Sequence, residues 1–137
     1  MASVIPAVMP TSLEHLASTL EIIAPFSNEV QIDIVDGKFV PFTSWPYTEK
    51  VSPKEMKKLI QDFVVEVDLM VEQAEEVIPE YAEAGVKRFV IHLESTLSLP
   101  AIMKLKAKYA FELGFSINND TDLRALTSVL PMADYVQ

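Results

Sequence analysis

Short runs of apolar and β-branched residues alternate along this chain with longer stretches of helical periodicity. The apolar runs recur about every 25–30 residues, a spacing typical of strand–helix–strand units that build a parallel sheet. Most of these runs are apolar almost throughout, as expected for strands that are covered on both faces of the sheet. This alternation constrains the fold more than any other feature, and it predicts an α/β domain with a parallel sheet.

The boundaries of the expected elements follow from helix start and stop signals. Ser12 and Ser52 are expected N-caps, and Pro53 occupies a favoured first helical position after the second serine. Gly85 and Gly114 are expected to end two helices. Strands are expected at residues 3–9, 29–35, 63–71, 88–93, 115–118 and 134–137. Helices are expected after the two serines, at 74–84, within 99–113, and from 121 or 122.

Two architectures have this order of elements: an open doubly wound sheet and a (β/α)8 barrel. A complete barrel takes roughly 250 residues, whereas this chain has 137 residues and stops within the apolar segment ADYVQ. A natural domain is not expected to stop inside a strand. We therefore interpret residues 1–137 as a single domain, a partial TIM (β/α)8-type barrel with about five βα units and the start of a sixth strand.

Composition excludes several classes of partner and site. The net charge of −9 argues against nucleic acids and anionic membranes, because an acidic surface repels both. The absence of cysteine excludes disulfides and thiolate metal sites. The segment MASVIPAVMP has neither the basic region nor the long apolar run of a signal peptide. A soluble cytoplasmic protein is therefore the expectation.

Polar residues recur within strands that otherwise look buried. Because side chains alternate across a strand, Gln31 and Asp33 share one face, and Ile32 and Ile34 share the other. The apolar pair is expected to pack beneath helices, and the polar pair to point into a barrel lumen. The same alternation groups residues of the next two strands: Glu66, Asp68 and Met70, and then Val90, His92 and Glu94. Barrel enzymes carry their active sites at the carboxyl ends of the strands, so these positions form the candidate site.

Five segments together resemble the ribulose-phosphate 3-epimerase family. The segment IDIVDGKFVP is similar to the second-strand signature of that family, and VDLMV and FVIHLEST are similar to its third- and fourth-strand motifs. The segments VIPAVMPTSLEHL and LGFSINNDTDLRAL are similar to its N-terminal and fifth-strand segments. They occur in the order and spacing of the family over nearly the whole chain. The resemblance implies a ribulose-phosphate-binding barrel.

The resemblance also implies an isomerase that interconverts ribulose 5-phosphate and xylulose 5-phosphate. In the family, two aspartates exchange a proton through an enediolate, and a divalent metal is held by two histidines and the same aspartates. Asp33 matches the first catalytic aspartate. The metal-ligand positions available in this chain are Gln31, Asp33 and Asp68, where the family has histidine at the first and third. The substrate-binding positions are Ala7, Asp68 and Met70, and Ala7 replaces a serine of the family.

These departures change the expected chemistry. Imidazole nitrogen suits zinc and iron, whereas carboxylate and amide oxygens suit magnesium or manganese. We therefore expect no cofactor, with Mg²⁺ or Mn²⁺ bound only weakly if a divalent cation binds at all. The second catalytic aspartate and the glycine-rich phosphate loops of the family would lie beyond Gln137. The chain is thus expected to be an epimerase-like truncated barrel that is not catalytically competent by itself.

Other interpretations stay open beside this one. The chain could be a non-catalytic half-barrel that associates with itself, or a sugar-phosphate-binding enzyme of different specificity. Homodimers or higher oligomers are expected because five or six strands cannot close a barrel, which leaves unpaired strand edges. The alternative for Asp68 is a lumen residue paired with Gln31. His92 is expected to be a packed, hydrogen-bonded strand residue rather than a metal ligand, and Trp45 to anchor a long loop.

Overall fold

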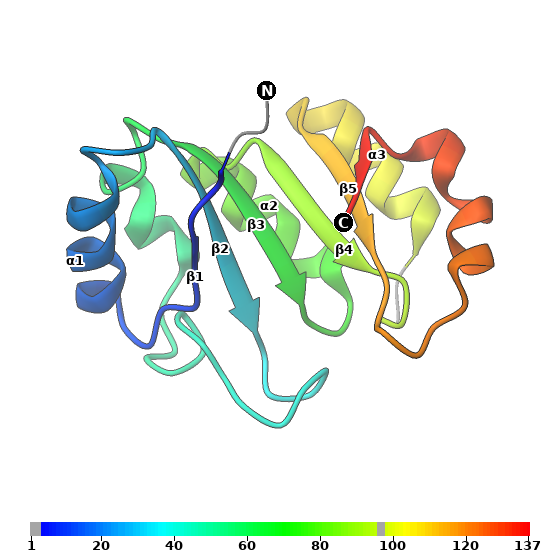
Figure 1. The fold of residues 1–137 in the computed structure, drawn as a ribbon, viewed down its shortest axis with the longest axis horizontal. Helices are drawn as coiled ribbons and strands as arrows, with labels where there is room; N and C mark the ends of the chain where they lie inside the picture. The colour runs from blue at the N-terminus through cyan, green and yellow to red at the C-terminus, as the bar shows by residue number, and fades with distance from the viewer. Residues whose placement is uncertain (1–3, 96–97) are drawn as a thin grey trace.

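The computed structural model describes residues 4–95 and 98–137, and within them six parallel strands form one open sheet (Figure 1). The strands lie side by side in the order of the sequence, and each neighbouring pair is parallel. A doubly wound sheet would reverse its strand order, so this topology confirms the predicted partial TIM-type barrel. The strands are β1 (Ala7–Val8), β2 (Glu29–Val35), β3 (Val64–Met70), β4 (Arg88–His92), β5 (Glu112–Ser116) and β6 (Tyr135–Val136).

The helices flank the sheet and lie behind it in the view of Figure 1. The predicted caps are present: the hydroxyl of Ser12 accepts from the backbone N–H of His15, that of Ser52 accepts from Lys54, and Gly85 follows its helix at φ +114°. The α-helices are α1 (Leu13–Ile23), α2 (Ala74–Ala84) and α3 (Leu99–Tyr109). The 3-10 helices are η1 (Pro53–Lys58), η2 (Leu123–Ser128) and η3 (Leu130–Met132).

The prediction that a helix ends at Gly114 is wrong. Helix α3 ends at Tyr109, and Ala110 adopts the left-handed conformation at its C-cap, with φ +53°. Gly114 lies in the middle of β5, where an added Cβ would stand 2.5 Å from Cε2 of Tyr135 in β6. This glycine therefore serves a close approach between two strands, and β5 begins earlier than the expected residue 115.

The apolar residues that alternate along the strands form the core together with the helices. The prediction that Ile32 and Ile34 pack beneath helices is confirmed, because both are fully buried in one cluster that also contains Leu16 and Leu20 of α1. Trp45 is fully buried in the same cluster, in agreement with its interpretation as a loop anchor. The core thus occupies the side of the sheet that faces the helices.

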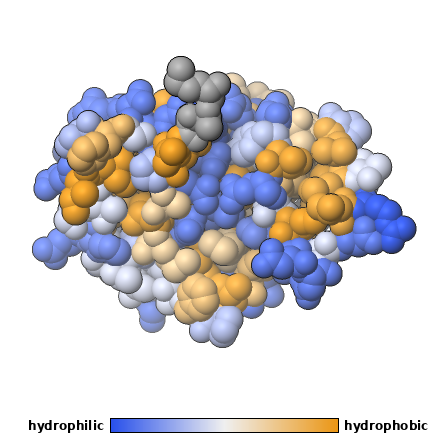
Figure 2. Space-filling view, viewed as in Figure 1, coloured by the Kyte–Doolittle hydropathy of each residue, from blue (hydrophilic) through white to orange (hydrophobic). Residues whose placement is uncertain are grey.

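The two edges of the sheet are short and carry exposed apolar groups. Strand β1 pairs with β2 and β6 with β5, so these two-residue strands bound the sheet. On the face of the molecule seen in Figure 1, Figure 2 shows hydrophobic groups on both sides of a hydrophilic middle. Exposed apolar residues at or beside the edge strands are Val4, Ile5, Met9 and Val136. Among the described residues, no helix has both the length and the apolar character needed to cross a membrane.

Candidate functional site

The candidate site lies on the sheet face opposite the core, the lumen face. Strand register places Asp33 of β2 beside Asp68 of β3, and Asp68 beside Val90 of β4. His92 lies two residues after Val90, so it shares this face at the carboxyl end of β4. The structure therefore brings together the lumen polar residues that the sequence assigned to neighbouring strands.

Asp33 is a partly buried carboxylate with one specific partner. Its Oδ1 accepts a hydrogen bond of 2.9 Å from Nε2 of Gln31, two residues earlier in β2. Burial raises the pKa of Asp33, and the hydrogen bond from Gln31 opposes that rise. The charge of Asp68 raises the pKa further, whereas His92 lowers it. The net result is a raised pKa, which makes Asp33 a better proton acceptor when it is ionised.

Asp68 and His92 form a buried pair beside Asp33. Nε2 of His92 lies 3.1 Å from Oδ1 of Asp68, and only 5% of Asp68 and 9% of His92 is exposed. The amide of Gln137 donates to Oδ2 of Asp68 at 3.4 Å. The expected alternative, Asp68 paired with Gln31, is wrong, because Gln31 bonds Asp33 instead. His92 is the packed, hydrogen-bonded residue that the sequence predicted.

The loop after β2 covers part of this end of the lumen. Its Phe39 packs against His92, with ring centroids 5.2 Å apart and ring planes tilted by 58°. Asp36 holds the loop: Oδ1 accepts from the backbone N–H groups of Lys38 and Phe39 at 2.8 and 3.0 Å, and Oδ2 from that of Glu72 at 2.9 Å. Burial opposes ionisation of Asp36, but these three donors outweigh it and lower the pKa.

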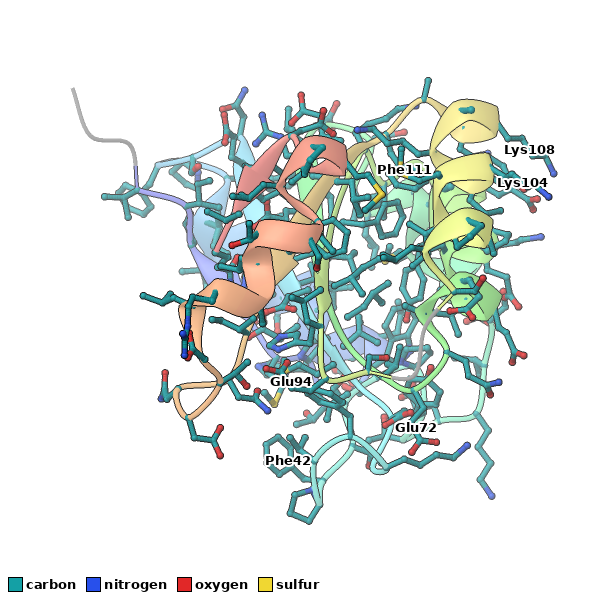
Figure 3. The ribbon with its side chains drawn as sticks, turned by 90° about the vertical axis from the view of Figure 1, so that its right-hand side faces the viewer. Phe42, Glu72, Glu94, Lys104, Lys108 and Phe111 are labelled. Carbon is teal, nitrogen blue, oxygen red and sulfur yellow. The ribbon has the colours of Figure 1, made fainter. Side chains whose placement is uncertain are left out.

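The carboxyl ends of the strands gather further polar and aromatic groups. Figure 3 shows Phe42, Glu72 and Glu94 at this same end of the molecule. Glu94 follows β4, and its Oε1 accepts hydrogen bonds from the backbone N–H of Asn118 and the hydroxyl of Thr121. These bonds connect the end of β4 to the loop after β5. Glu94 therefore serves the local structure of this rim.

Two of the predicted substrate positions lie at the border of the lumen face. Ala7 pairs with Gln31 across the β1–β2 ladder and is exposed at the sheet edge. Met70 lies opposite Val35 at the carboxyl end of β3 and is partly buried. Their roles in binding stay predictions, as does the catalytic role of Asp33.

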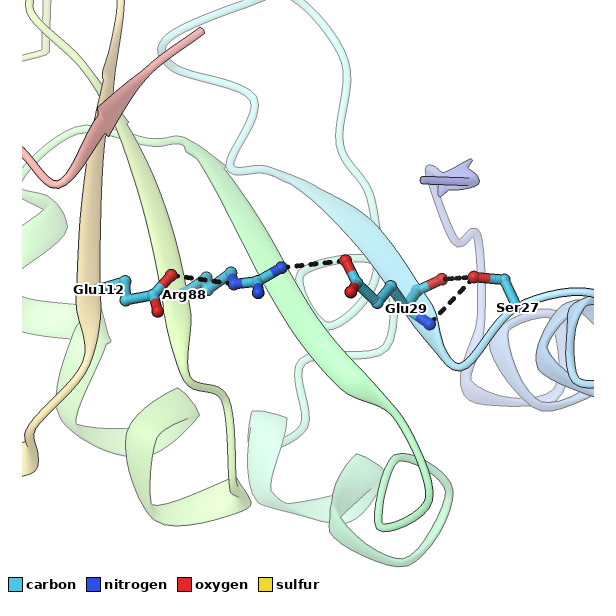
Figure 4. Close-up of polar contacts among 4 residues, drawn as sticks. All are labelled: Ser27, Glu29, Arg88 and Glu112. Atoms are coloured by element: carbon cyan, nitrogen blue, oxygen red, sulfur yellow. Dashed lines mark hydrogen bonds and ion pairs between the residues drawn. The ribbon is translucent and has the colours of Figure 1, made fainter. Parts of the chain in front are cut away.

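An ion-paired row crosses the opposite end of the lumen face, and the sequence analysis missed it (Figure 4). Arg88 lies 3.1 Å from a carboxylate oxygen of Glu29 and 3.0 Å from one of Glu112. Glu66 and Tyr135 lie beside this row and line, with Arg88, a pocket of about 400 Å³. The signal was available, because Arg88 precedes Val90 and His92 at the two-residue spacing of one strand face.

The donor atoms at the site do not fit a tightly held metal. The side-chain N–H of Gln31 donates a hydrogen bond to Asp33, and both oxygens of Asp68 accept hydrogen bonds. Within residues 4–95 and 98–137, no three His, Cys, Asp or Glu side chains are grouped so that they could hold a metal ion. The weak binding of Mg²⁺ or Mn²⁺ at Gln31, Asp33 and Asp68 therefore stays a prediction.

Comparison with known proteins adds evidence of a different kind. The model of the ribulose-phosphate 3 epimerase family matches residues 3–137. The chain is 28% identical over 104 residues to a ribulose-phosphate 3-epimerase of Aquifex aeolicus, covering 76% of this chain and 45% of that protein. A ribulose-phosphate 3-epimerase of Bacillus subtilis is 26% identical over 139 residues, covering 99% of this chain and 61% of the relative. The chain spans about half the length of the curated relatives it matches.

Proposed function

Since the chain belongs to the ribulose-phosphate 3-epimerase family, we propose that it binds a phosphorylated ketopentose at the carboxyl ends of β2, β3 and β4. The observation that carries the proposal is the placement of Asp33, which is partly buried on the lumen face, bonded to Gln31 and raised in pKa. A carboxylate of this kind is suited to accept the proton from a carbon next to a ketone. The names of the relatives suggest a ribulose phosphate, and ribulose 5-phosphate is the one that the family resemblance implies.

We also propose that this chain does not epimerise ribulose 5-phosphate at an enzymatic rate. Removing a proton next to a ketone develops negative charge on the oxygen, and that charge needs a preorganised electrostatic partner. Gln31 and Asp68 stand where the family resemblance implies histidine ligands, and both are engaged in hydrogen bonds with protein groups. Loss of such a stabilising group typically costs about 10²–10³-fold in rate.

Binding and turnover can be measured separately. Addition of ribulose 5-phosphate to the ¹⁵N-labelled chain is expected to shift backbone amide resonances around Asp33 and Asp68. Asp33→Asn is expected to weaken this binding, whereas Glu112→Gln, at the far end of the lumen face, is expected to leave it unchanged. An assay coupled to xylulose 5-phosphate formation is expected to remain at background. Absence of amide shifts would refute the binding proposal, and turnover that Asp33→Asn abolishes would refute the second proposal.

The edges of the sheet favour a second candidate function, self-association. Val4 and Val136 are 85% and 50% exposed at or beside opposite edges of the sheet, and strand edges also present unpaired backbone groups. Burying apolar surface contributes about 25 cal/mol per Å², so pairing two such edges would be favourable. We propose a two-fold dimer as the simplest closed assembly. Sedimentation equilibrium at low micromolar concentration is expected to give twice the chain mass, and a well-folded monomer would rule the proposal out.

A further inference from the structure

His92 carries a buried nitrogen that has no partner within the described residues. Its Nε2 is paired with Asp68, whereas its Nδ1 is shielded from solvent and makes no hydrogen bond in the described part of the chain. The residue as a whole is 9% exposed. A buried polar atom without a partner destabilises the fold, so it calls for a physical explanation. The position of this atom, at the carboxyl end of β4 and on the face of Asp33, suggests one.

Asp68 determines what Nδ1 can do. A carboxylate only accepts hydrogen bonds, so the pairing at 3.1 Å requires Nε2 of His92 to carry a hydrogen. In the neutral ring, Nδ1 is then left with a lone pair and can only accept. In this neutral form, the missing partner of Nδ1 is a donor, such as a hydroxyl group. Asp68 acts through His92 here and is a positioning residue.

We infer that Nδ1 of His92 accepts a hydrogen bond from a hydroxyl group of the bound ketopentose phosphate. The inference rests on the proposed function, since it needs a polyol ligand at this end of the lumen. Phe39 packs against the imidazole and belongs to the loop after β2. This contact supplies ligand recognition through protein hydrogen bonds at a site whose donor atoms do not fit a tightly held metal.

The chain allows a direct spectroscopic test because it contains only two histidines. Long-range ¹⁵N spectra distinguish the ring nitrogens of His92 from those of His15. Nδ1 of His15 accepts from the backbone N–H of Thr11 at 3.1 Å in an exposed hydrogen bond, so His15 is an internal control. Addition of ribulose 5-phosphate is expected to shift the Nδ1 resonance of His92 and leave that of His15 unchanged. Inorganic phosphate alone is expected to leave both unchanged.

A variant isolates the accepting atom. His92→Gln keeps an amide donor near the position of Nε2, so the bond to Asp68 can form, but it removes the acceptor at Nδ1. We expect the thermal midpoint to stay within a few degrees of the parent, and the affinity for ribulose 5-phosphate to fall about tenfold, the effect of one hydrogen bond. Asp68→Asn frees the ring to reverse its tautomer and is expected to weaken binding as well.

The outcomes separate this inference from the proposed function. If the parent chain shows no amide shifts with ribulose 5-phosphate, the proposed function fails. If the parent binds while the Nδ1 resonance of His92 stays unchanged and His92→Gln binds equally well, this inference is wrong and the proposed function stands. If His92→Gln does not fold, the ¹⁵N spectrum of the parent chain decides by itself.

Discussion

The two faces of the sheet are built from the same strands but are stabilised in different ways. On the helix-facing side, fully buried strand residues pack in one apolar cluster; they include Ile32, Ile34, Val67, Leu69, Phe89, Ile91 and Phe115. On the lumen face, polar side chains are held by individual hydrogen bonds and ion pairs. These residues include Gln31, Asp33, Asp68, Arg88 and His92.

The difference teaches where this chain can carry chemistry. Complete burial of an aliphatic or phenylalanine side chain contributes about 1.5–3 kcal/mol, whereas a typical internal hydrogen bond contributes about 1 kcal/mol net. The helix-facing side therefore supplies most of the stability. Polar residues on the lumen face can be exchanged at lower cost to the fold, which is consistent with Gln31 and Asp68 at positions where the family resemblance implies histidine.

Replacing a core aromatic should give the largest effect. Phe89→Ala removes a fully buried ring that packs edge-to-face on Phe111 at 4.8 Å, and we expect a loss of about 3–5 kcal/mol. Val90→Ala, the next residue and on the lumen face, lies outside the core cluster and should cost about 1.5 kcal/mol. Urea unfolding measures both. Equal losses in the free energy of unfolding would contradict the conclusion that the helix-facing side supplies most of the stability.

Gly114→Ala tests a lumen position where packing is tight. The added Cβ would stand 2.5 Å from the ring of Tyr135, so the ring must move. We expect a loss of about 1–3 kcal/mol in urea unfolding, typical of overpacking. The double variant with Tyr135→Ala should lose less than the sum of the single variants, because the clash is gone. Additive losses would show that the ring is not the cause.

Asp33→Asn should reveal a pH dependence that arises on the lumen face. The pKa of Asp33 is raised in the folded chain, mainly by burial, so its ionisation weakens the fold. Below about pH 3.8 the carboxyl is protonated in both states, and parent and variant should be equally stable. As the pH rises through the raised pKa, the variant should become the more stable protein, by about 1 kcal/mol or less. Urea unfolding between pH 3.5 and pH 7 measures this difference.

Glu94→Gln is the matched control for that experiment. Burial opposes the ionisation of Glu94, but hydrogen bonds from Thr121 and Asn118 outweigh it and lower its pKa. Its stabilising contribution is therefore present above about pH 4.5 and is lost as the pH falls through the lowered value. The variant should be less stable than the parent at pH 7, which is the opposite sign to Asp33→Asn. If both variants changed stability at pH 7 in the same direction, the opposite pKa shifts of Asp33 and Glu94 would be refuted.

The smallest effect is expected at the ion-paired row. The Glu112 side chain is 59% exposed, so its pairing with Arg88 is well screened, and Glu112→Gln should cost less than about 1 kcal/mol. The loss should shrink further in 1 M NaCl. Glu29→Gln, where the side chain is 36% exposed, should cost slightly more. A loss that does not respond to salt would show that Glu112 acts through packing instead.

The sequence predicted the fold well where local signals agree with tertiary packing. Strand β2 and helix α2 match their expected residues at both ends; the apolar run of β2 stops before Asp36 and Gly37, and Gly85 follows the last residue of α2. The helix end predicted at Gly114 was wrong because a glycine after a helical stretch resembles a C-cap. Only the contact with Tyr135 shows why this position requires a glycine. The two-residue period placed Asp33 and Asp68 on one face. It could not give the pairs Gln31–Asp33 and Asp68–His92, because these depend on rotamers and neighbouring strands.

Asp36 couples two segments that follow different strands. One oxygen accepts from the loop after β2 and the other from the backbone of Glu72 after β3, so both segments depend on one carboxylate. In terms of local unfolding, the amides of Lys38, Phe39 and Glu72 should open as one cooperative unit, so hydrogen exchange should give them a common free energy of opening. Asp36→Asn, which keeps only one accepting oxygen, should divide this unit in two and give the amides separate free energies of opening.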